Sequence, residues 1–515
     1  MPILAENLVV TSQPLACQAG LEMLKNGGNA VDAAIAAAIT LTVVEPVNNG
    51  IGSDAFAILW NGKELIGLNA SGRSPSNWTS ELFSRYKAMP QLGWPSVTIP
   101  GAVSAWVSLS NKFGKLPFKN LFKPAIKYAE NGFLISPIIA EVWKLESQMY
   151  KKRKFPVFWS TFMPNDRAPQ AGELFKLPYH AKTLKIIAET KGEAFYNGVL
   201  AKKMVKYAKE TGGFFELEDF ENHQPIWEKP ISIEYKGIKL HEMPPNSQGI
   251  TALIMLGILK QSKLESYKND AIGSIHLQIE AMKLAFSDAN SYLSDISTME
   301  FHPKYLLKES YLSKRSDLIN RTYAQKFEHG FPHNEDTVYL TTADSNGMMV
   351  SYIQSNFWGF GSGIVIPSTG ISLQNRGCGF SLVKGHPNQV GPNKRPFHTI
   401  IPGFVTKKGK PLMSFGVMGG QFQPQGHAQM IVRIYDYRQN PQAALDAPRW
   451  RVMQGLNVKV EKDFNEDLIN GLTQLGHIVS KSHYFDFGGG QIIFKLDNGY
   501  LGASDKRKDG QVVGF

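Results

Sequence analysis

Thr337 begins an apolar strand that should fold back on itself at Asn346-Gly347. That dipeptide between alternating apolar runs is a strong hairpin signal. In a two-residue turn Thr337 faces Asn356, and if the turn slips back by one residue it faces Gln354. Either register predicts that Ser355 and Asn356 lie close to the Thr337 hydroxyl.

A threonine hydroxyl with polar neighbours could act as a nucleophile if Thr337 became a chain terminus. The hypothesis requires cleavage of the Asp336–Thr337 bond, by attack of the hydroxyl on the preceding carbonyl and hydrolysis of the resulting ester. The freed α-amino group, with an ordinary pKa of about 7.7–8.0, would suit general-base work near neutrality. Threonine is also common in strands, so a structural role is the alternative.

A glycine pair, Gly419-Gly420, follows the apolar run 414–418 and precedes a predicted helix at 425–437. Exposed N–H groups there could stabilise an oxyanion, each well-aimed donor contributing about 3–4 kcal/mol. A tight strand-to-helix turn is the alternative.

Three further side chains lie in loop-like segments. Arg73 and Arg376 could each bind a carboxylate through two parallel hydrogen bonds, or could brace a loop. His398, followed by Thr399, could line a pocket or serve as a hydrogen-bonded structural residue. The twelve histidines show no metal-ligand spacing, so we expect no metal site.

Composition describes an ordinary soluble protein with a substantial core: 515 residues, 43% apolar and 19% charged, with a net charge of +11. The basic runs 151–154 and 506–508 are short and match no nucleic-acid motif, so no nucleic-acid partner is expected. No signal peptide is evident, and the most apolar stretch, 33–44, falls short of the ~20 residues needed to cross a bilayer. We expect a cytoplasmic protein without a membrane partner.

The pattern of elements changes near Thr337. Helices are predicted at 13–25 and 30–44, followed by a hairpin at 55–68. The region from 101 to 310 is predicted to be mainly helical, with helices at 247–259 and 273–293, and strands are predicted after residue 336 at 413–417, 458–461 and 491–494. Asn29 caps the second helix, which is apolar on nearly all sides and therefore buried.

Ordered motifs along nearly the whole chain resemble the γ-glutamyltransferase family, including its cephalosporin (glutaryl) acylase branch. They are 27–34, 44–46, 96–101, 244–249, the Asp336-Thr337 junction, 375–381, Gly419-Gly420 and 503–510.

The resemblance implies an α+β fold, the four-layer αββα sandwich of N-terminal nucleophile hydrolases. It implies autocleavage into a large subunit, 1–336, and a small subunit, 337–515, which together form one catalytic domain and need no cofactor. Thr337 matches the nucleophile, Ser355 the hydroxyl residue that bonds it, and Gly419 and Gly420 the oxyanion-hole pair.

Substrate positions depart from the transferase pattern. Cys378-Gly379 replaces the family's aspartate pair, one of whose members binds the glutamyl α-amino group, and His398-Thr399 replaces a Ser-Ser pair. Arg73 is out of register with the family's arginine. The family's asparagine aligns with Phe357, with Asn356 adjacent.

These features resemble the acylase branch more closely. We therefore expect a small amide substrate with a terminal carboxylate, of γ-glutamyl or glutaryl type, whose acyl group passes to water or to an amino acid or peptide. The alternative is an uncleaved, non-catalytic homologue that binds a carboxylated ligand.

Overall fold

The computed structural model describes residues 2–327 and 336–515. Its centre is two seven-stranded antiparallel sheets. The first, here the β10 sheet, has the order β19 (Gln511–Gly514), β2 (Leu8–Thr11), β10 (Asp336–Ala343), β11 (Met349–Phe357), β3 (Asp54–Trp60), β4 (Leu65–Ala70), β7 (Ile226–Glu228). The second, the β13 sheet, has the order β1 (Ile3–Ala5), β18 (Tyr500–Ser504), β17 (Gly489–Lys495), β13 (Lys410–Met418), β12 (Gly403–Lys407), β9 (Ile238–Glu242), β8 (Ile231–Tyr235).

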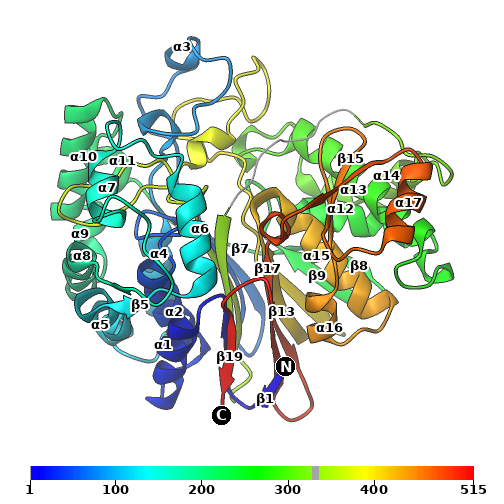
Figure 1. Ribbon diagram of the computed structural model, residues 1–515, viewed down its shortest axis with the longest axis horizontal. Helices are drawn as coiled ribbons and strands as arrows, with labels where there is room; N and C mark the ends of the chain where they lie inside the picture. Colours follow the sequence, from blue (N-terminus) through cyan, green and yellow to red (C-terminus); the bar gives the residue numbers. More distant parts are fainter. Residues whose placement is uncertain (1, 328–335) are drawn as a thin grey trace.

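Helices cover the outer face of each sheet, which confirms the predicted αββα layering (Figure 1). On the β10 side lie α1 (Pro14–Lys25), α2 (Ala30–Val44), α4 (Ala102–Phe113), α5 (Lys123–Asn131), α6 (Pro137–Ser147), α7 (Pro156–Phe162), α8 (Pro178–Glu189), α9 (Glu193–Tyr196), α10 (Val199–Thr211) and α11 (Leu217–Glu221). On the β13 side lie α12 (Gly249–Lys260), α13 (Ile272–Tyr292), α14 (Glu309–Ser316), α15 (Gln423–Ile431), α16 (Pro441–Asp446) and α17 (Glu466–Gln474). Among the described residues no helix combines the length and apolarity needed to cross a bilayer.

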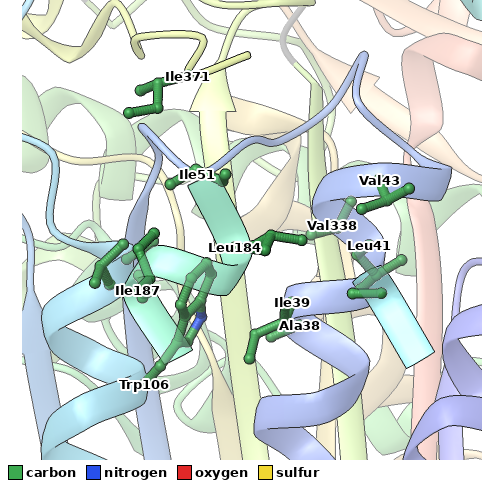
Figure 2. Packing of buried hydrophobic residues seen from close by; sticks show 14 of the residues in the cluster. Ala38, Ile39, Leu41, Val43, Ile51, Trp106, Leu184, Ile187, Val338 and Ile371 are labelled. Atoms are coloured by element: carbon green, nitrogen blue, oxygen red, sulfur yellow. The ribbon is translucent and has the colours of Figure 1, made fainter. Parts of the chain in front are cut away.

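Helix α2 matches its predicted bounds and begins with a capping box formed by Asn29 and Asp32. Every residue of α2 is buried. Val338 of β10 belongs to the same apolar cluster as Ile39 and Leu41 of this helix (Figure 2).

The central strands are buried on both faces, so successive side chains enter different cores. Val338 and Leu340 of β10 contribute to the cluster beneath the helices. Tyr339 and Ala343 contribute to the cluster between the two sheets, which also holds Ile493 of β17. By this alternation Thr337 should share the inter-sheet face with Tyr339.

The predicted hairpin of β10 and β11 is present. From Val338 to Ala343 its register lies between the two expected ones, and at Asp336, which pairs with Phe357, it is the first of them. Ala343 pairs with Met349, and Gly347, with φ of 89°, closes a longer turn in which its N–H donates to the Asp344 carbonyl at 3.0 Å. A bulge then shifts the pairing between Asp336 and Val338. Thr337 thus lies in the bulge, opposite the Ser355–Asn356 end of β11.

The predicted helices near residues 249–260 and 272–292 and the strands at β13, β15 (Asn457–Glu461) and β17 are present. Strands β8 and β9 depart from the mainly helical pattern expected before Ser310. They form a hairpin on the β13 sheet, whose packing decides their conformation. β15 lies in a small sheet with β14 (Trp450–Val452) and β16 (Ile478–Ser482), and β5 (Phe133–Leu134) pairs with β6 (Leu174–Phe175).

Candidate active site

Thr337 lies between the sheets and is 1% exposed. Its Oγ1 donates to Ser355 Oγ at 3.3 Å and accepts from Gln423 Nε2 at 3.3 Å. The structure therefore brings Thr337 and Ser355 together, as the hairpin predicted. Gln423 opens α15 and was not foreseen, because a glutamine at a helix start carries no sequence signal of its own.

Asn356 has different partners from Ser355. Its side-chain carbonyl accepts from Ser53 Oγ at 2.8 Å, and its Nδ2 donates to Ser372 Oγ at 3.2 Å. Its backbone carbonyl accepts from the N–H of Asn375 at 3.1 Å. These bonds place Asn356 as a support for the loop before Arg376, not beside the Thr337 hydroxyl.

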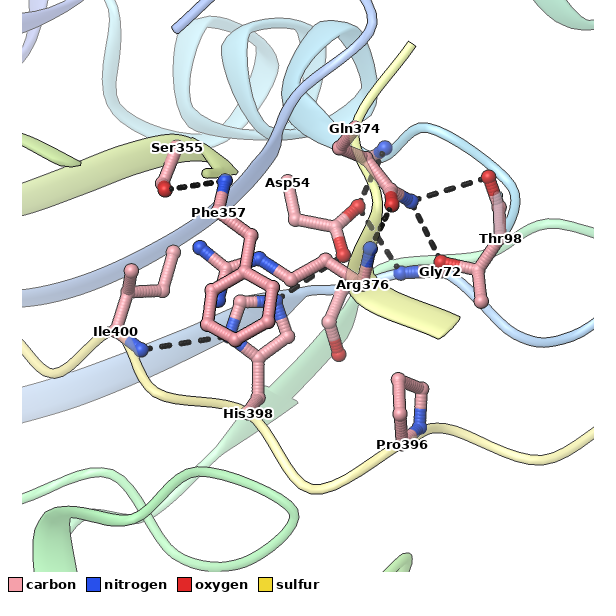
Figure 3. Close-up of polar contacts among 12 residues, drawn as sticks. Asp54, Gly72, Thr98, Ser355, Phe357, Gln374, Arg376, Pro396, His398 and Ile400 are labelled. Carbon is pink, nitrogen blue, oxygen red and sulfur yellow. Dashed lines mark hydrogen bonds and ion pairs between the residues drawn. The ribbon is translucent and has the colours of Figure 1, made fainter. Parts of the chain in front are cut away.

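Strand β11 ends at Phe357 in a left-handed conformation, with φ of 82°. Such a backbone costs a bulky residue on the order of 1–3 kcal/mol and persists only where its surroundings hold it. Here the Phe357 N–H donates to Ser355 Oγ at 2.8 Å, and the Trp358 N–H donates to Asn375 Oδ1 at 3.2 Å. The turn orients the Phe357 ring toward Arg376 (Figure 3).

Arg376 and Thr399 are adjacent and buried. Arg376 Nη1 donates to Thr399 Oγ1 at 2.7 Å, and its guanidinium carbon lies 4.5 Å from the Phe357 ring centroid. Gln248 Nε2 then bridges the carbonyls of Thr399 and Gly420, at 2.9 Å from the latter. Gly419 and Gly420, both with positive φ, connect β13 to the turn before Gln423.

These contacts form a closed circuit around the threonine: Thr337, Ser355, Phe357, Arg376, Thr399, Gln248, Gly420 and, three residues along the chain, Gln423. It unites the predicted nucleophile, its hydroxyl partner, one residue of the glycine pair and two predicted substrate residues. Gln248, a buried residue just before α12, also escaped the sequence analysis.

Asp54 and His398 form a fully buried pair behind this circuit (Figure 3). The Ile400 N–H points at His398 Nδ1 from 3.4 Å, so Nε2 carries the imidazole proton and donates to Asp54 Oδ2 at 3.1 Å. Burial and the positive charge of Arg376 hold the pKa of His398 well below its ordinary value. His398 is therefore a neutral residue paired with a carboxyl group.

Burial raises the pKa of Asp54 to about 7, although Arg376 and the N–H groups of Gly72 and Gly101 favour its ionised form. Oδ1 accepts from those two N–H groups at 3.3 and 3.1 Å. At each glycine a Cβ would lie 1.5 Å from a backbone carbonyl oxygen, so only glycine fits. Asp54 was missed because nothing distinguishes it from any aspartate at a strand start.

Arg73 stands apart from the circuit. Its carbonyl accepts from the Ile99 N–H at 3.0 Å. Burial lowers the pKa of Arg395 and of His223, and the charge of Arg73 adds to both shifts. The half-buried Arg73 is adjacent in sequence to Gly72, whose N–H donates to Asp54, and Arg395 also acts on Asp54 through its charge.

A cavity of about 360 Å³ opens beside the circuit. Phe357 and Thr399 belong to both the circuit and the lining of the cavity, which is otherwise mainly apolar: Met89, Trp358, Cys378, Phe380, Leu382, Val383 and Phe397, with Lys87, Gln91 and Gln421. The volume suits a small organic ligand. Its described lining includes no aspartate or glutamate.

Two facing sheets with helices outside, and polar residues gathered between the sheets at one end, are the architecture of N-terminal nucleophile hydrolases. The sequence pattern of Gamma-glutamyltranspeptidase matches residues 16–515, and the chain belongs to that family. It is similar to the glutathione hydrolase-like YwrD proenzyme of Bacillus subtilis, at 35% identity over 99% of this chain and 98% of that protein.

Two other relatives carry different activities in their names. The oxamate amidohydrolase proenzyme of Klebsiella pneumoniae is 31% identical over 99% of this chain and 98% of its own length. The crystal structure of cephalosporin acylase from Bacillus halodurans superposes with a TM-score of 0.95 at 45% identity, covering 100% of this chain and 97% of that one. The family is thus an amidohydrolase family whose members differ in substrate.

The buried Asp54 carboxyl should make stability depend on pH. Because its pKa rises from 3.8 to about 7 on folding, the folded state retains a proton that the unfolded state loses between those values. Folding therefore loses stability as pH rises through this window, by up to about 4 kcal/mol. We expect Asp54→Asn to reduce the fall in the thermal midpoint between pH 5 and pH 8.

Glu64→Gln, at an exposed position, is the control and should follow the parent protein. Equal slopes for the parent protein and Asp54→Asn would mean that Asp54 is ionised throughout this range.

Proposed function

We propose that this chain is an autoprocessed threonine amidohydrolase that also has acyltransferase capacity. The observation that carries the proposal is the Thr337 hydroxyl, buried between the sheets and bonded to both Ser355 and Gln423. Cleavage before Thr337 would give subunits 1–336 and 337–515. The relatives named as proenzymes support this processing.

In the proposed cleavage, Thr337 Oγ attacks the Asp336 carbonyl carbon, the C–N bond breaks, and the nitrogen takes the hydroxyl proton. Water then hydrolyses the ester, leaving Asp336 as a carboxylate and Thr337 with a free α-amino group. The positions of Ser355 and Gln423 suit them to orient Oγ, since one accepts a hydrogen bond from it and the other donates one.

In turnover, the α-amino group takes the Oγ proton while Oγ attacks the substrate amide. The N–H groups of Gly419 and Gly420 would stabilise the oxyanion, because their positive φ values turn this backbone away from the regular strand. The proton passes to the departing amine, and water, or less readily an amino acid or peptide, takes the acyl group.

The substrate would be an amide with an anionic acyl end, of γ-glutamyl or glutaryl type. Arg376 does not line the cavity, but its guanidinium contacts two residues that do, Thr399 and Phe357, and would supply positive charge behind them. Cys378 occupies a family aspartate position, and the described lining offers no carboxylate to pair an α-ammonium group. These features favour a glutaryl-type acyl group, consistent with the cephalosporin acylase likeness.

A non-catalytic, uncleaved protein that binds a carboxylated ligand is the second candidate. The same cavity and buried guanidinium would serve it equally well. Cleavage of the chain before Thr337 distinguishes the two candidates, because only the enzyme requires it.

Thr337→Ala should abolish processing, because it removes the attacking oxygen. A denaturing gel of the parent protein should show two fragments, and the variant a single full-length band. Thr337→Ser, which retains a hydroxyl, is the matched control and should still be cleaved. A parent protein that stays full length after long incubation would favour the binding protein.

Substrate preference should follow the charge at position 378. With γ-glutamyl and glutaryl anilides assayed side by side, we expect higher kcat/KM on the glutaryl compound. Cys378→Asp should raise the γ-glutamyl to glutaryl ratio about 10-fold or more, since a charge-assisted hydrogen bond contributes about 1.5–3 kcal/mol. Cys378→Asn, whose side chain has the shape of aspartate without its charge, should leave this ratio unchanged. An equal rise of the ratio in both variants would contradict a charge effect.

A further inference from the structure

A second buried polar cluster lies on the far side of the β13 sheet. His276, Glu280 and Lys283 share one face of α13, at positions i, i+4 and i+7, and His477 follows α17. Their exposed fractions are 0, 0, 4 and 2%. Groups this deeply buried require partners.

The hydrogen bonds fix where the protons lie. His276 Nε2 is 2.8 Å from the Asn320 carbonyl, which can only accept, so His276 Nδ1 accepts from His477 Nε2, also at 2.8 Å. His477 Nδ1 then faces Lys283 Nζ at 3.5 Å and accepts. His477 is therefore neutral, because burial and the positive charge of Lys283, with a smaller effect of His276, lower its pKa to about 3.

The same residues have the composition of a metal site. His276, Glu280 and His477 each offer a ligand atom, all within 4.8 Å of one another. However, the Lys283 ammonium already pairs with Glu280 at 2.6 Å, and each imidazole nitrogen already has a hydrogen-bonding role. The cluster is complete as a hydrogen-bonded network.

What the network binds is the chain that leads to the proposed cleavage site. Glu280 Oε2 accepts from the Gln325 N–H at 3.1 Å, and Lys283 Nζ donates to the Gln325 carbonyl at 3.0 Å. His276 binds the Asn320 carbonyl, and the Ala324 N–H donates to the Leu475 carbonyl at 2.6 Å. His477 and Leu475 belong to the proposed small subunit, so these contacts cross the proposed subunit boundary.

We propose that His276, Glu280, Lys283 and His477 anchor segment 320–325 and thereby position the chain entering the Asp336–Thr337 bond for cleavage. The inference rests on the proposed function. Only residues 326–335 separate the anchored Gln325 from Asp336. If the whole segment came loose, including the bond from Arg321 Nη2 to the Ser262 carbonyl at 3.1 Å, the chain would be free from the end of α14 at Ser316 and the connection would be roughly twice as long. After cleavage the same contacts would hold the end of the large subunit against the small one.

Lys283→Met tests this, because it retains the aliphatic stem and removes the ammonium. Gln278→Leu is the matched control on the same helix, where the Gln278 amide bonds to Ser274 and not to the segment. Hydrogen exchange is measured in the uncleavable Thr337→Ala background. We expect the amides of Ala324 and Gln325 to exchange at least 10-fold faster in Lys283→Met and to be unchanged in Gln278→Leu.

Processing is measured separately, with Thr337 present. The entropy of the longer chain predicts cleavage about two- to threefold slower in Lys283→Met, with kcat per processed site unchanged. Lys283→Arg, which restores a cation, should recover part of the protection. If Lys283→Met does not fold, Glu280→Gln, which keeps an acceptor for Gln325, replaces it.

Unchanged exchange at Ala324 and Gln325, or a loss of kcat equal to the loss of cleavage rate, would overturn the anchor. Stoichiometric Zn²⁺ binding by the parent protein that is lost in His477→Gln would also overturn it, in favour of a metal site. A parent protein that is never cleaved would refute the proposed function instead, while the exchange measurement would still report on the anchor.

Discussion

The double burial of strand β10 is the constraint on which the site depends. Since α2 covers one face and the β13 sheet the other, alternate side chains must enter two different interiors. Thr337 and Ser355 point between the sheets, where the turn after β13 and the start of α15 can reach them. Asn356 has different partners and braces a loop. A shift of one residue in register would exchange these roles.

The polar circuit lowers the cost of burying polar groups between the sheets, because most of its members pair with one another. Gln248 shows the principle: one amide group satisfies carbonyls on two loops, and so sets the glycine turn relative to Thr399. Both proposed subunits contribute residues to the site: Gln248 and Asp54 belong to the large subunit, and Thr337 and Thr399 belong to the small one. The site therefore requires the whole sandwich, although every residue matched to the acylation chemistry lies in 337–515.

Sequence patterns predicted the elements well and the exact geometry poorly. Helix α2 was found to the residue, because a capping box and a continuous apolar run are local signals. The hairpin was found, but its register was not: Asp344 accepts from the Ala30 N–H at 2.8 Å, so the turn is fixed by a helix remote in sequence. Gln423 and Asp54 owe their positions to strand packing, which no local pattern records.

The charges of the site explain why its specificity can differ from that of a transferase. Arg376 is buried and lies between a ring, a hydroxyl and the Asp54–His398 pair. A carboxyl group with a pKa near 7 only partly neutralises it at physiological pH. With a thiol rather than a carboxylate at Cys378, the described lining of the cavity contains Lys87 and no carboxylate, and Arg376 lies behind Phe357 and Thr399. Positive charge there would stabilise an anion and disfavour an ammonium group beside it, which supports the proposed acyl chain that ends in a carboxylate and lacks an α-amino group.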